Sequence, residues 1–438
     1  MVPLELLFYH EYSASQLVLH LPRIIMVVLD GASDKPGSQP TPLETAKTPH
    51  LDSLVKTGKL GMLYTVGKGI APESDAGVFS LLGYDPLSIH LSRGVVETIG
   101  ADLEFHDGDL ALRAGFATVE GDKLVDRRAG RNLSTDEAVR LGDALNREIR
   151  LKDKVQFEFK ATVGHRAVLV FRGNGRSFSS SISNFDPAYF RKGNISIAMP
   201  GKGPYALPKC EPLESSRDAV YSSALVNEFG FKARSVLDLH PVNLERRKRG
   251  QLAANFVLMR DAGTERPRVQ GFREKWGMDP AMIADLPAEL GIGRVLGMDI
   301  RELAPGTSLA GYSKRAEAVL EATKDYEFVY VHLKGPDEPG HDGLRDEKAR
   351  RISDIDEGFF SVLAKDGLNG RVLCVTCDHS TPWVAKGHSD DPVPVLVRER
   401  GGGEGSTSDR FTESEAASGA LGVMNRGSLL IERLVGAG

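Results

Sequence analysis

Three stretches of the chain consist almost entirely of apolar residues and lead to an acidic side chain at or shortly after their end. The stretches begin at residues 24, 328 and 372, and the acids that follow them are Asp30, Asp337 and Asp378. Continuous apolar runs of this length are typical of strands that are buried on both faces of a parallel sheet. The carboxyl ends of parallel strands meet at one edge of such a sheet. The pattern therefore predicts an α/β protein whose acidic residues gather at that edge.

Histidines follow two of these runs. His341 lies four residues after Asp337, while His379 and His388 follow Asp378. A single Asp-x-x-x-His pattern also arises by chance on protein surfaces, so it says little by itself. Three carboxylates and three imidazoles beside strand ends are harder to explain in that way, because buried charges require a partner or a metal. We therefore predict a dinuclear metal site. Oxygen and imidazole ligands fit Mn²⁺ or Zn²⁺, with Mg²⁺ at an oxygen-rich position.

Ser74 is a seventh candidate, and it lies outside the three apolar runs. Residues 76–82 favour a short helix that Gly83 would end. Ser74 would then stand at the helix N-terminus, where free N–H groups and the helix dipole favour an alkoxide or a phosphate. The commoner role of a serine in that place is only to cap the helix. Beside a metal site we favour the other interpretation, a nucleophile.

The candidate ligands form an early and a late group, with a long middle region between them. This spacing predicts one sheet that is interrupted by an inserted domain. We expect a core with a mixed, mostly parallel sheet flanked by helices, and an α+β insert. The expected parts are an N-terminal extension (residues 1–22), the first part of the metal-binding core (23–104), an inserted substrate-binding domain (105–250) and the second part of the core (251–438).

The middle region carries the best candidates for binding an anion. Residues 157–173 alternate as paired strands do, and Ser134-Thr-Asp-Glu137 forms a capping box before a helix. Short spans of this region contain several basic side chains, namely Arg127, Arg128, Arg131, His165 and Arg166. Arginine forks suit carboxylate and phosphate oxygens. The basic run at residues 245–250 is expected instead to be a solvated surface.

Composition sets wider limits on the function. The chain has 438 residues, of which 41% are hydrophobic and 26% charged, as in a soluble globular protein of two domains. The net charge of −5 provides no global basic field, so we expect no nucleic-acid partner. Cys374 and Cys377 form a C-x-x-C within a strand pattern, and we expect packing residues rather than a redox or zinc pair. No apolar run approaches a membrane span and residues 1–22 make a poor signal peptide, so we expect no membrane partner and a cytoplasmic location.

Eight blocks of the sequence carry a resemblance to a known family. They are VVLDGASD, TPLETAKTPHLDSL, ESDAGVFSLLGYDP, RGVVETIGADLEF, DRRAGRNLS, GHRAVLVFRG, VHLKGPDEPGHDG and CDHSTPWVAKGHSDDPVPVLV. Together they resemble the archaeal-type, cofactor-independent phosphoglycerate mutases of the alkaline phosphatase superfamily. The resemblance runs in order from about residue 23 to the C-terminus, so it covers nearly the whole chain.

The resemblance implies a fold, a reaction and a set of residue roles. The fold would have an alkaline-phosphatase-like core, and the reaction would interconvert 3-phosphoglycerate and 2-phosphoglycerate in glycolysis and gluconeogenesis without 2,3-bisphosphoglycerate. Ser74 would be phosphorylated transiently. The metal ligands would be Asp30, Ser74, Asp378 and His379 for one ion and Asp337, His341 and His388 for the other. The expected ion is Mn²⁺, with Zn²⁺, Mg²⁺ and Co²⁺ as alternatives. The expected substrate ligands are Arg131, His165, Arg166 and, as a weaker candidate on the core side, Arg260.

Two departures from the family pattern bear on the substrate. Relatives usually have Gly before the nucleophile, where this chain has Glu73, and they differ again from its residues 305–312. The same two-metal core would also serve a phosphomonoesterase or another phosphomutase, and a non-catalytic phosphate-binding descendant is a further alternative. All seven candidate site residues being intact argues against the non-catalytic alternative.

Overall fold

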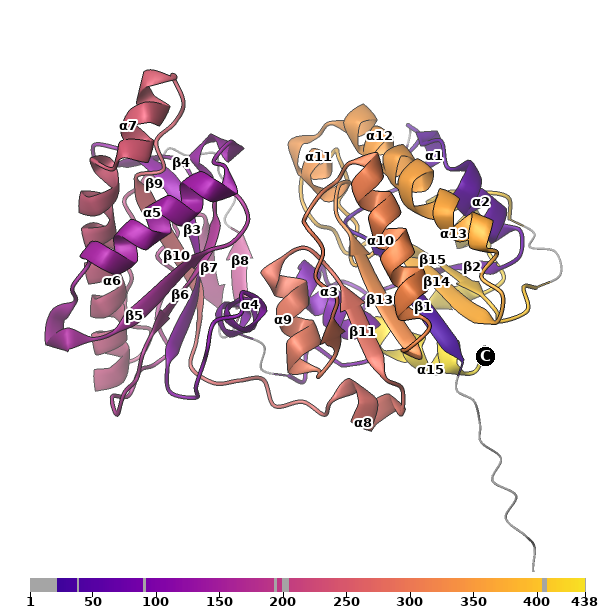
Figure 1. Ribbon diagram of the computed structural model, residues 1–438, viewed down its shortest axis with the longest axis horizontal. Coiled ribbons are helices and arrows are strands. Elements are labelled where there is room, and N and C mark those ends of the chain that lie inside the picture. Colours follow the sequence, from indigo (N-terminus) through magenta and orange to yellow (C-terminus); the bar gives the residue numbers. More distant parts are fainter. Residues whose placement is uncertain are drawn as a thin grey trace, which may run out of the picture.

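The main sheet of the computed structural model has eight strands, in the order β12–β11–β13–β1–β14–β15–β2–β16 (Figure 1). The structure describes residues 22–437 except 38, 90–91, 193–194, 199–204 and 404–407. The strands are β1 (Arg23–Leu29), β2 (Lys59–Leu63), β11 (Pro280–Ile283), β12 (Asp299–Ile300), β13 (Phe328–Leu333), β14 (Arg371–Thr376), β15 (Val393–Arg398) and β16 (Gly422–Met424). Only β15 runs against its neighbours β14 and β2, so the predicted mixed, mostly parallel sheet is confirmed.

The three apolar runs of the sequence form the centre of this sheet. Strands β13, β1 and β14 are adjacent and parallel, with Leu29 opposite Leu333 and Val28 opposite Thr376. All of their residues are buried except Arg23 and Arg371 at the strand starts. Burial on both faces explains the lack of polar alternation in these segments. Because the three strands are in register, the residues that follow them emerge at one edge of the sheet.

Helices flank the main sheet and connect its strands. Those of the core are α1 (Pro42–Thr45), α2 (Pro49–Val55), α3 (Ser74–Leu81), α4 (Arg93–Gly100), α8 (Phe272–Trp276), α9 (Pro287–Val295), α10 (Leu309–Ala322), α11 (Asp337–Asp342), α12 (Arg345–Ile355), α13 (Ser361–Asp366), α14 (Glu413–Ala417) and α15 (Leu430–Val435). A π-helical turn at Asp356–Phe360 joins α12 to α13. Helix α3 begins at Ser74, two residues before the predicted start, and Glu73 is its N-cap residue.

A second sheet forms the inserted domain, which lies beside the core (Figure 1). Its strands are β3 (Leu110–Glu120), β4 (Lys123–Asp126), β5 (Phe157–Ala161), β6 (Arg166–Phe171), β9 (Tyr205–Ala206) and β10 (Phe256–Gly263), and β7 (Tyr189–Lys192) pairs with β8 (Ile195–Ala198). Its helices are α5 (Thr135–Glu148), α6 (Arg217–Asp238) and α7 (Pro241–Lys248), with 3₁₀ turns at Ala129–Arg131 and Lys152–Lys154 and a further one in the core at Gly427–Leu429. The paired strands and the capping box of Ser134 and Glu137 are confirmed.

Two expectations about this domain differ from the structure. Strand β10 follows residue 250 yet pairs antiparallel with β3, so the insert sheet extends beyond the predicted limit and Arg260 lies on the insert, not on the core side. Within the basic run at 245–250, Arg246 is fully buried, so the expectation of a solvated surface is wrong for that residue. Both differences arise from contacts between distant segments, which local patterns do not reveal.

Several smaller expectations can be compared with the described residues. Cys374 and Cys377 are both buried and free, as expected of packing residues. The proposed N-terminal extension lies outside the described residues, apart from Pro22. In the parts of the chain that the structure describes, no helix is long and apolar enough to cross a membrane.

Candidate active site

The edge of the main sheet where β1, β13 and β14 end brings the predicted acids together. Asp30 directly follows β1, Asp378 lies two residues beyond β14, and Asp337 opens α11 just after β13. The N–H of Gly31 donates a hydrogen bond to Asp378 Oδ1 at 3.1 Å, which joins two of these strand ends directly. The structure thus brings together the carboxylates that the apolar pattern predicted.

One group of ligand atoms surrounds His379. Its Nε2 atom lies 3.2 Å from Ser74 Oγ, 3.2 Å from Asp378 Oδ2 and 3.7 Å from Asp30 Oδ1. Asp30 Oδ1 and Asp378 Oδ2 are buried without a hydrogen-bond partner. Unpartnered buried carboxylate oxygens are costly unless a cation satisfies them.

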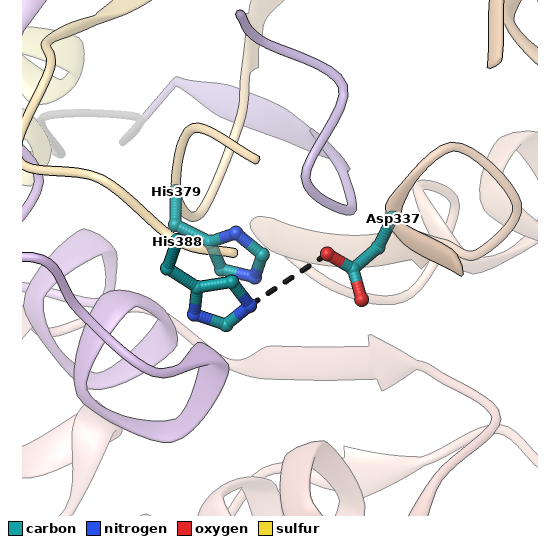
Figure 2. A group of neighbouring side chains, drawn as sticks. All are labelled: Asp337, His379 and His388. Carbon is teal, nitrogen blue, oxygen red and sulfur yellow. Dashed lines mark ion pairs between the residues drawn. The ribbon is translucent and has the colours of Figure 1, made fainter. Parts of the chain in front are cut away.

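A second group forms on α11 and the loop after β14, and Figure 2 shows two of its members, Asp337 and His388, together with His379. Asp337 Oδ1 lies 3.5 Å from His341 Nε2 and 3.6 Å from His388 Nε2, and the two imidazole nitrogens are 3.2 Å apart. The ring of His379 stacks on that of His388 with centroids 3.7 Å apart, so the two groups are neighbours. Burial would raise the pKa of Asp337, but its hydrogen bond to His388 and the nearby histidines hold that pKa well below its usual range.

The hydrogen bonds on the far side of each imidazole indicate which nitrogen faces the site. His388 Nδ1 lies 2.8 Å from the carbonyl of Pro72, and His341 Nδ1 lies 3.3 Å from the carbonyl of Lys386. A carbonyl only accepts, so both Nδ1 atoms carry a hydrogen, and both Nε2 atoms face the site.

His379 is fixed in the same way by a hydroxyl. The Thr381 hydroxyl donates to Asp337 Oδ1 at 2.8 Å, so it accepts from His379 Nδ1 at 2.9 Å. The Nε2 atom of His379 therefore faces Ser74, Asp378 and Asp30. Partners of this kind are what metal-binding histidines ordinarily have.

The spacing of both groups suits a divalent cation, although the side chains that lie closest together fall in different sets, Asp337 with His379 and His388, and Asp30 with His332 and Asp378. Ligands about 2.1 Å from an ion in tetrahedral geometry are separated by roughly 3.4 Å, close to the distances found here. The donor set of carboxylate oxygens, imidazole nitrogens and one hydroxyl, without thiolate, suits Mn²⁺ or Zn²⁺. The combination of spacing, Nε2 atoms that face the site and unpartnered carboxylate oxygens supports a two-metal site.

The sequence pattern did not predict three neighbours of the first group, which are Lys334, Glu289 and His332. Lys334 Nζ lies 3.2 Å from Asp30 Oδ2 and 2.7 Å from Glu289 Oε1. Burial would lower the pKa of Lys334, but these two carboxylates raise it well above its ordinary value, so the ammonium stays charged. His332 is fully buried, and its Nε2 faces Asp30 Oδ1 at 3.5 Å. The available signal was a pair of basic residues in and after an otherwise apolar strand.

His332 has a tyrosine hydroxyl beside its Nδ1 atom. Its Nδ1 lies 2.8 Å from the hydroxyl of Tyr330, which is buried. The Nε2 atom of His332 faces the carboxylate oxygens of Asp30 and Asp378, at 3.5 and 3.8 Å. His332, Asp30 and Asp378 together also form a group that could hold a metal ion.

Ser74 is the first residue of α3, which approaches the strand end at Asp378 closely. A Cβ atom at Gly77 would lie 2.4 Å from the carbonyl oxygen of Asp378, so only glycine permits this contact. Glu73, which precedes Ser74, forms an ion pair with Arg93 at 2.9 Å. Burial would raise the pKa of Glu73, but Arg93 and other cations hold it at about 2.

A cavity of about 650 Å³ lies between this edge of the core and the insert. Ser74, Asp30, Asp337, His341, His388 and Lys334 line its core side. Its other side carries mostly basic residues, namely Arg93, Arg113, Arg127, Arg128, His165, Arg166 and Arg260. The arrangement can hold an anionic molecule between two cations and a group of guanidinium ions.

The four expected substrate residues occupy different places. Arg260 lines the cavity and stacks on the Tyr189 ring at 3.8 Å. His165 also lines it, and burial together with Arg166 lowers its pKa to about 3, so it is neutral near pH 7. Arg166 lies 3.7 Å from Glu338. Arg131 does not line the cavity and instead contacts Asp342 of the core.

Comparisons with known proteins point to one family. A family described as 2,3-bisphosphoglycerate-independent phosphoglycerate mutase matches residues 55–243. A 2,3-bisphosphoglycerate-independent phosphoglycerate mutase of Aeropyrum pernix is 42% identical over 94% of this chain and 98% of the relative. One from Archaeoglobus fulgidus is 38% identical over 91% of this chain and 94% of the relative. The structure of a cofactor-independent phosphoglycerate mutase from Thermoplasma acidophilum matches with a TM-score of 0.60 and 32% identity, over 95% of this chain and all of that one.

Proposed function

The chain belongs to the 2,3-bisphosphoglycerate-independent phosphoglycerate mutases and is an enzyme that interconverts 3-phosphoglycerate and 2-phosphoglycerate, and we propose that it does so through a phosphoserine on Ser74 at a two-metal site. The observation that supports this mechanism is the position of Ser74 Oγ, 3.2 Å from a metal-ligand nitrogen and facing an arginine-lined cavity. Asp30, Ser74, Asp378 and His379 would hold one cation, and Asp337, His341 and His388 the other. Mn²⁺ is the ion that we propose.

The two sides of the cavity suit the two ends of a phosphoglycerate. We propose that the phosphoryl group lies against the core side, next to Ser74, and that the carboxylate lies on the insert. Arg260 and Arg166 would bind carboxylate oxygens, with His165 as a neutral hydrogen-bond donor. Arg113 and Arg128 reach the same cavity and are additional candidates. Arg131 remains a prediction, and its guanidinium is engaged by Asp342.

In the first half of the reaction, Ser74 Oγ attacks phosphorus in line. The bond between phosphorus and the glycerate oxygen breaks, the bond to Ser74 forms, and the departing oxygen takes a proton. Two bound cations would lower the pKa of the serine hydroxyl and offset the phosphoryl charge. Lys334 contributes a further fixed positive charge beside Asp30.

In the second half, glycerate reorients without leaving, and its other hydroxyl takes the phosphoryl group from Ser74. Ser74 regains its hydroxyl hydrogen and the enzyme is unchanged. Water must be kept away while phosphoserine exists, because hydrolysis would give glycerate and inorganic phosphate. The insert, which forms the opposite wall of the cavity, is the part of the molecule that can exclude it.

A phosphomonoesterase is the second candidate, and Glu73 is the observation that favours it. A carboxylate next to the nucleophile would repel the anionic glycerate and so favour its release. In this chain, however, the Glu73 charge is compensated by Arg93 at 2.9 Å, which weakens the argument. The mutase therefore remains the better proposal.

The test supplies the purified protein with Mn²⁺ and 3-phosphoglycerate in the absence of 2,3-bisphosphoglycerate. The formation of 2-phosphoglycerate and of free phosphate is followed in the same sample, with Ser74→Ala as the control. We expect 2-phosphoglycerate with little phosphate, and neither product from the variant. Phosphate without 2-phosphoglycerate would identify a hydrolase, and unchanged activity of Ser74→Ala would reject the phosphoserine.

A further inference from the structure

One ion pair crosses from the insert to the helix that carries metal ligands. Nη1 of Arg131 on the insert lies 2.6 Å from Oδ1 and 2.7 Å from Oδ2 of Asp342. Asp342 is the last residue of α11, whose first residue is Asp337 and whose fifth is His341. A second and longer pair joins the insert to the same helix, Arg166 of β6 to Glu338 of α11 at 3.7 Å. The insert thus contacts the helix that carries two of the three candidate ligands of the second group, Asp337 and His341.

The backbone that presents Arg131 has an unusual conformation. Ala129, Gly130 and Arg131 all have positive φ angles, of 46°, 72° and 56°. Such angles are uncommon for residues with a side chain, and they persist only where the surroundings enforce them. Three consecutive positive angles turn the chain sharply, and Arg131 projects from this turn towards the core.

Arg246 is the residue that enforces this turn. Its guanidinium is completely buried and donates to the carbonyl of Ala129 and to both the carbonyl and the side chain of Asn132. From the other side, Asp126 Oδ1 accepts hydrogen bonds from the N–H groups of Arg128 and Gly130. Arg246, which also pairs with Glu137 at 2.8 Å, thus holds Ala129 and Asn132, and Asp126 holds Arg128 and Gly130. The turn that presents Arg131 is fixed from both sides.

We propose that the Arg131–Asp342 pair is a selectivity device that keeps the insert against the core while phosphoserine exists, and so decides whether glycerate or water accepts the phosphoryl group. The inference rests on the proposed function, since it concerns the second half of that reaction. In both outcomes the bond from phosphorus to Ser74 Oγ breaks and Ser74 regains a hydrogen from the acceptor. With glycerate as acceptor the product is 2-phosphoglycerate, and with water it is inorganic phosphate plus glycerate.

The geometry favours this role over direct binding of substrate by Arg131. Asp342 lines the cavity whereas Arg131 does not, so Arg131 contacts Asp342 from outside the space that the substrate would fill. One guanidinium nitrogen contacts both carboxylate oxygens, so Arg131 is engaged by Asp342 in this structure. Arg131 and Asp342 are therefore positioning residues, and they act through the closure of the cavity.

The test compares four variants of the full chain, loaded with Mn²⁺. Asp342→Asn and Arg131→Asp each remove the pair, and the double variant R131D/D342R restores it with the charges exchanged. Aspartate tolerates the positive φ at position 131, and arginine is favourable at a helix C-terminus, so the exchange suits both backbones. Asp346→Asn is the matched control, because that side chain is 94% exposed and pairs only with its neighbour Arg345 within the core. Free phosphate and 2-phosphoglycerate are measured together, with bound metal and the melting temperature alongside.

We expect each single variant to raise the ratio of phosphate to 2-phosphoglycerate about fivefold, which is equivalent to ~1 kcal/mol, the upper range for an exposed ion pair. The exchanged pair should restore the ratio, while Asp346→Asn should leave it unchanged. An unchanged ratio in both single variants with normal metal content, or a raised KM in Arg131→Asp alone without rescue by the exchange, would overturn the inference. Wild-type protein that makes no 2-phosphoglycerate would instead reject the proposed function.

Discussion

The two walls of the cavity carry opposite charge, and they are built from different kinds of structure. The core wall collects carboxylates and imidazoles at the ends of parallel strands, within a sheet that is buried on both faces. The insert wall collects guanidinium groups from β3, β6, β10 and the turn after β4. The core wall has carboxylate oxygens that no cation of the wall satisfies. On the insert wall some guanidinium groups have an acidic partner, as Arg127 has in Asp186, while others lie close to one another.

The hydrogen bonds of each wall indicate what it lacks. On the core side, Asp30 and Asp378 each have a buried oxygen without a partner. On the insert side, burial and then the neighbouring guanidinium groups of Arg260 and Arg93 lower the pKa of Arg113 to about 10, and burial and Arg131 lower that of Arg128. A wall that crowds cations is stabilised by an anion. The difference supports the proposal that the core holds metal ions and that the insert binds the substrate.

Removing one carboxylate from the core wall should have the largest effect. Asp378→Asn should lower metal binding and turnover by more than the roughly 10- to 100-fold that loss of an outer-shell partner costs, because Asp378 would be a ligand itself. Metal content and mutase activity would be measured, with the exposed Asp325→Asn as control. Full metal content in Asp378→Asn would show that Asp378 is not a metal ligand and would contradict the role proposed for the core wall.

A change on the insert wall should act on the substrate and not on the metals. Arg260→Met should raise the KM for 3-phosphoglycerate by about 10- to 100-fold, the value of one or two charged hydrogen bonds, with metal content unchanged. Arg147→Met removes an exposed guanidinium elsewhere on the insert and should leave the KM as it was. If Arg260→Met lost metal instead, the two walls would not be separate in function.

A smaller effect is expected from the imidazole behind the first ligand group. His332→Asn removes the imidazole that faces Asp30 and Asp378, and should weaken metal binding by about tenfold. Tyr330→Phe removes only the hydroxyl beside His332 Nδ1 and should weaken metal binding less. Calorimetric titration of the metal-free proteins with Mn²⁺ would measure both. Equal affinity in wild type and His332→Asn would contradict a role of His332 in metal binding.

The last prediction concerns stability rather than catalysis. Behind the core wall, Glu413 is fully buried beside Asp34 and Lys348, and Lys348 Nζ pairs directly with Asp34 at 2.8 Å. One ammonium cannot balance two carboxylates, and burial raises the pKa of Glu413 to about 7. Because the folded pKa lies above the unfolded one, the stabilisation is complete below about pH 4.5 and is lost as the pH rises through about 7.

Glu413→Gln mimics the protonated acid and should flatten this part of the pH dependence. We expect the free energy of unfolding of wild type to fall relative to that of the variant by about 1 to 3 kcal/mol between pH 5 and pH 8. Urea denaturation across that range would measure the difference. Parallel curves for the two proteins would show that Glu413 is ionised throughout, and activity should be the same in both at pH 7.

Local patterns were sufficient for the centre of the fold. Buried parallel strands need continuous apolar runs, so β1, β13 and β14 and the acids after them could be found from residue order alone. The helix after Ser74 and the capping box at Ser134 follow from short-range rules of the same kind. The limits of the insert were less predictable, because β10 joins its sheet by pairing with β3, more than 130 residues earlier.

By itself, the sequence determined the α/β core and predicted the seven candidate ligands and the nucleophile, because each depends on a residue and its immediate neighbours. Only the tertiary structure decided which nitrogen of each histidine faces the site, since that depends on carbonyls and hydroxyls of other segments. It also decided that Arg246 is buried, that His332 stands behind Asp30, and that Arg131 meets Asp342 across 211 positions of the chain. These are contacts between charged groups brought together by folding, and no local periodicity encodes them.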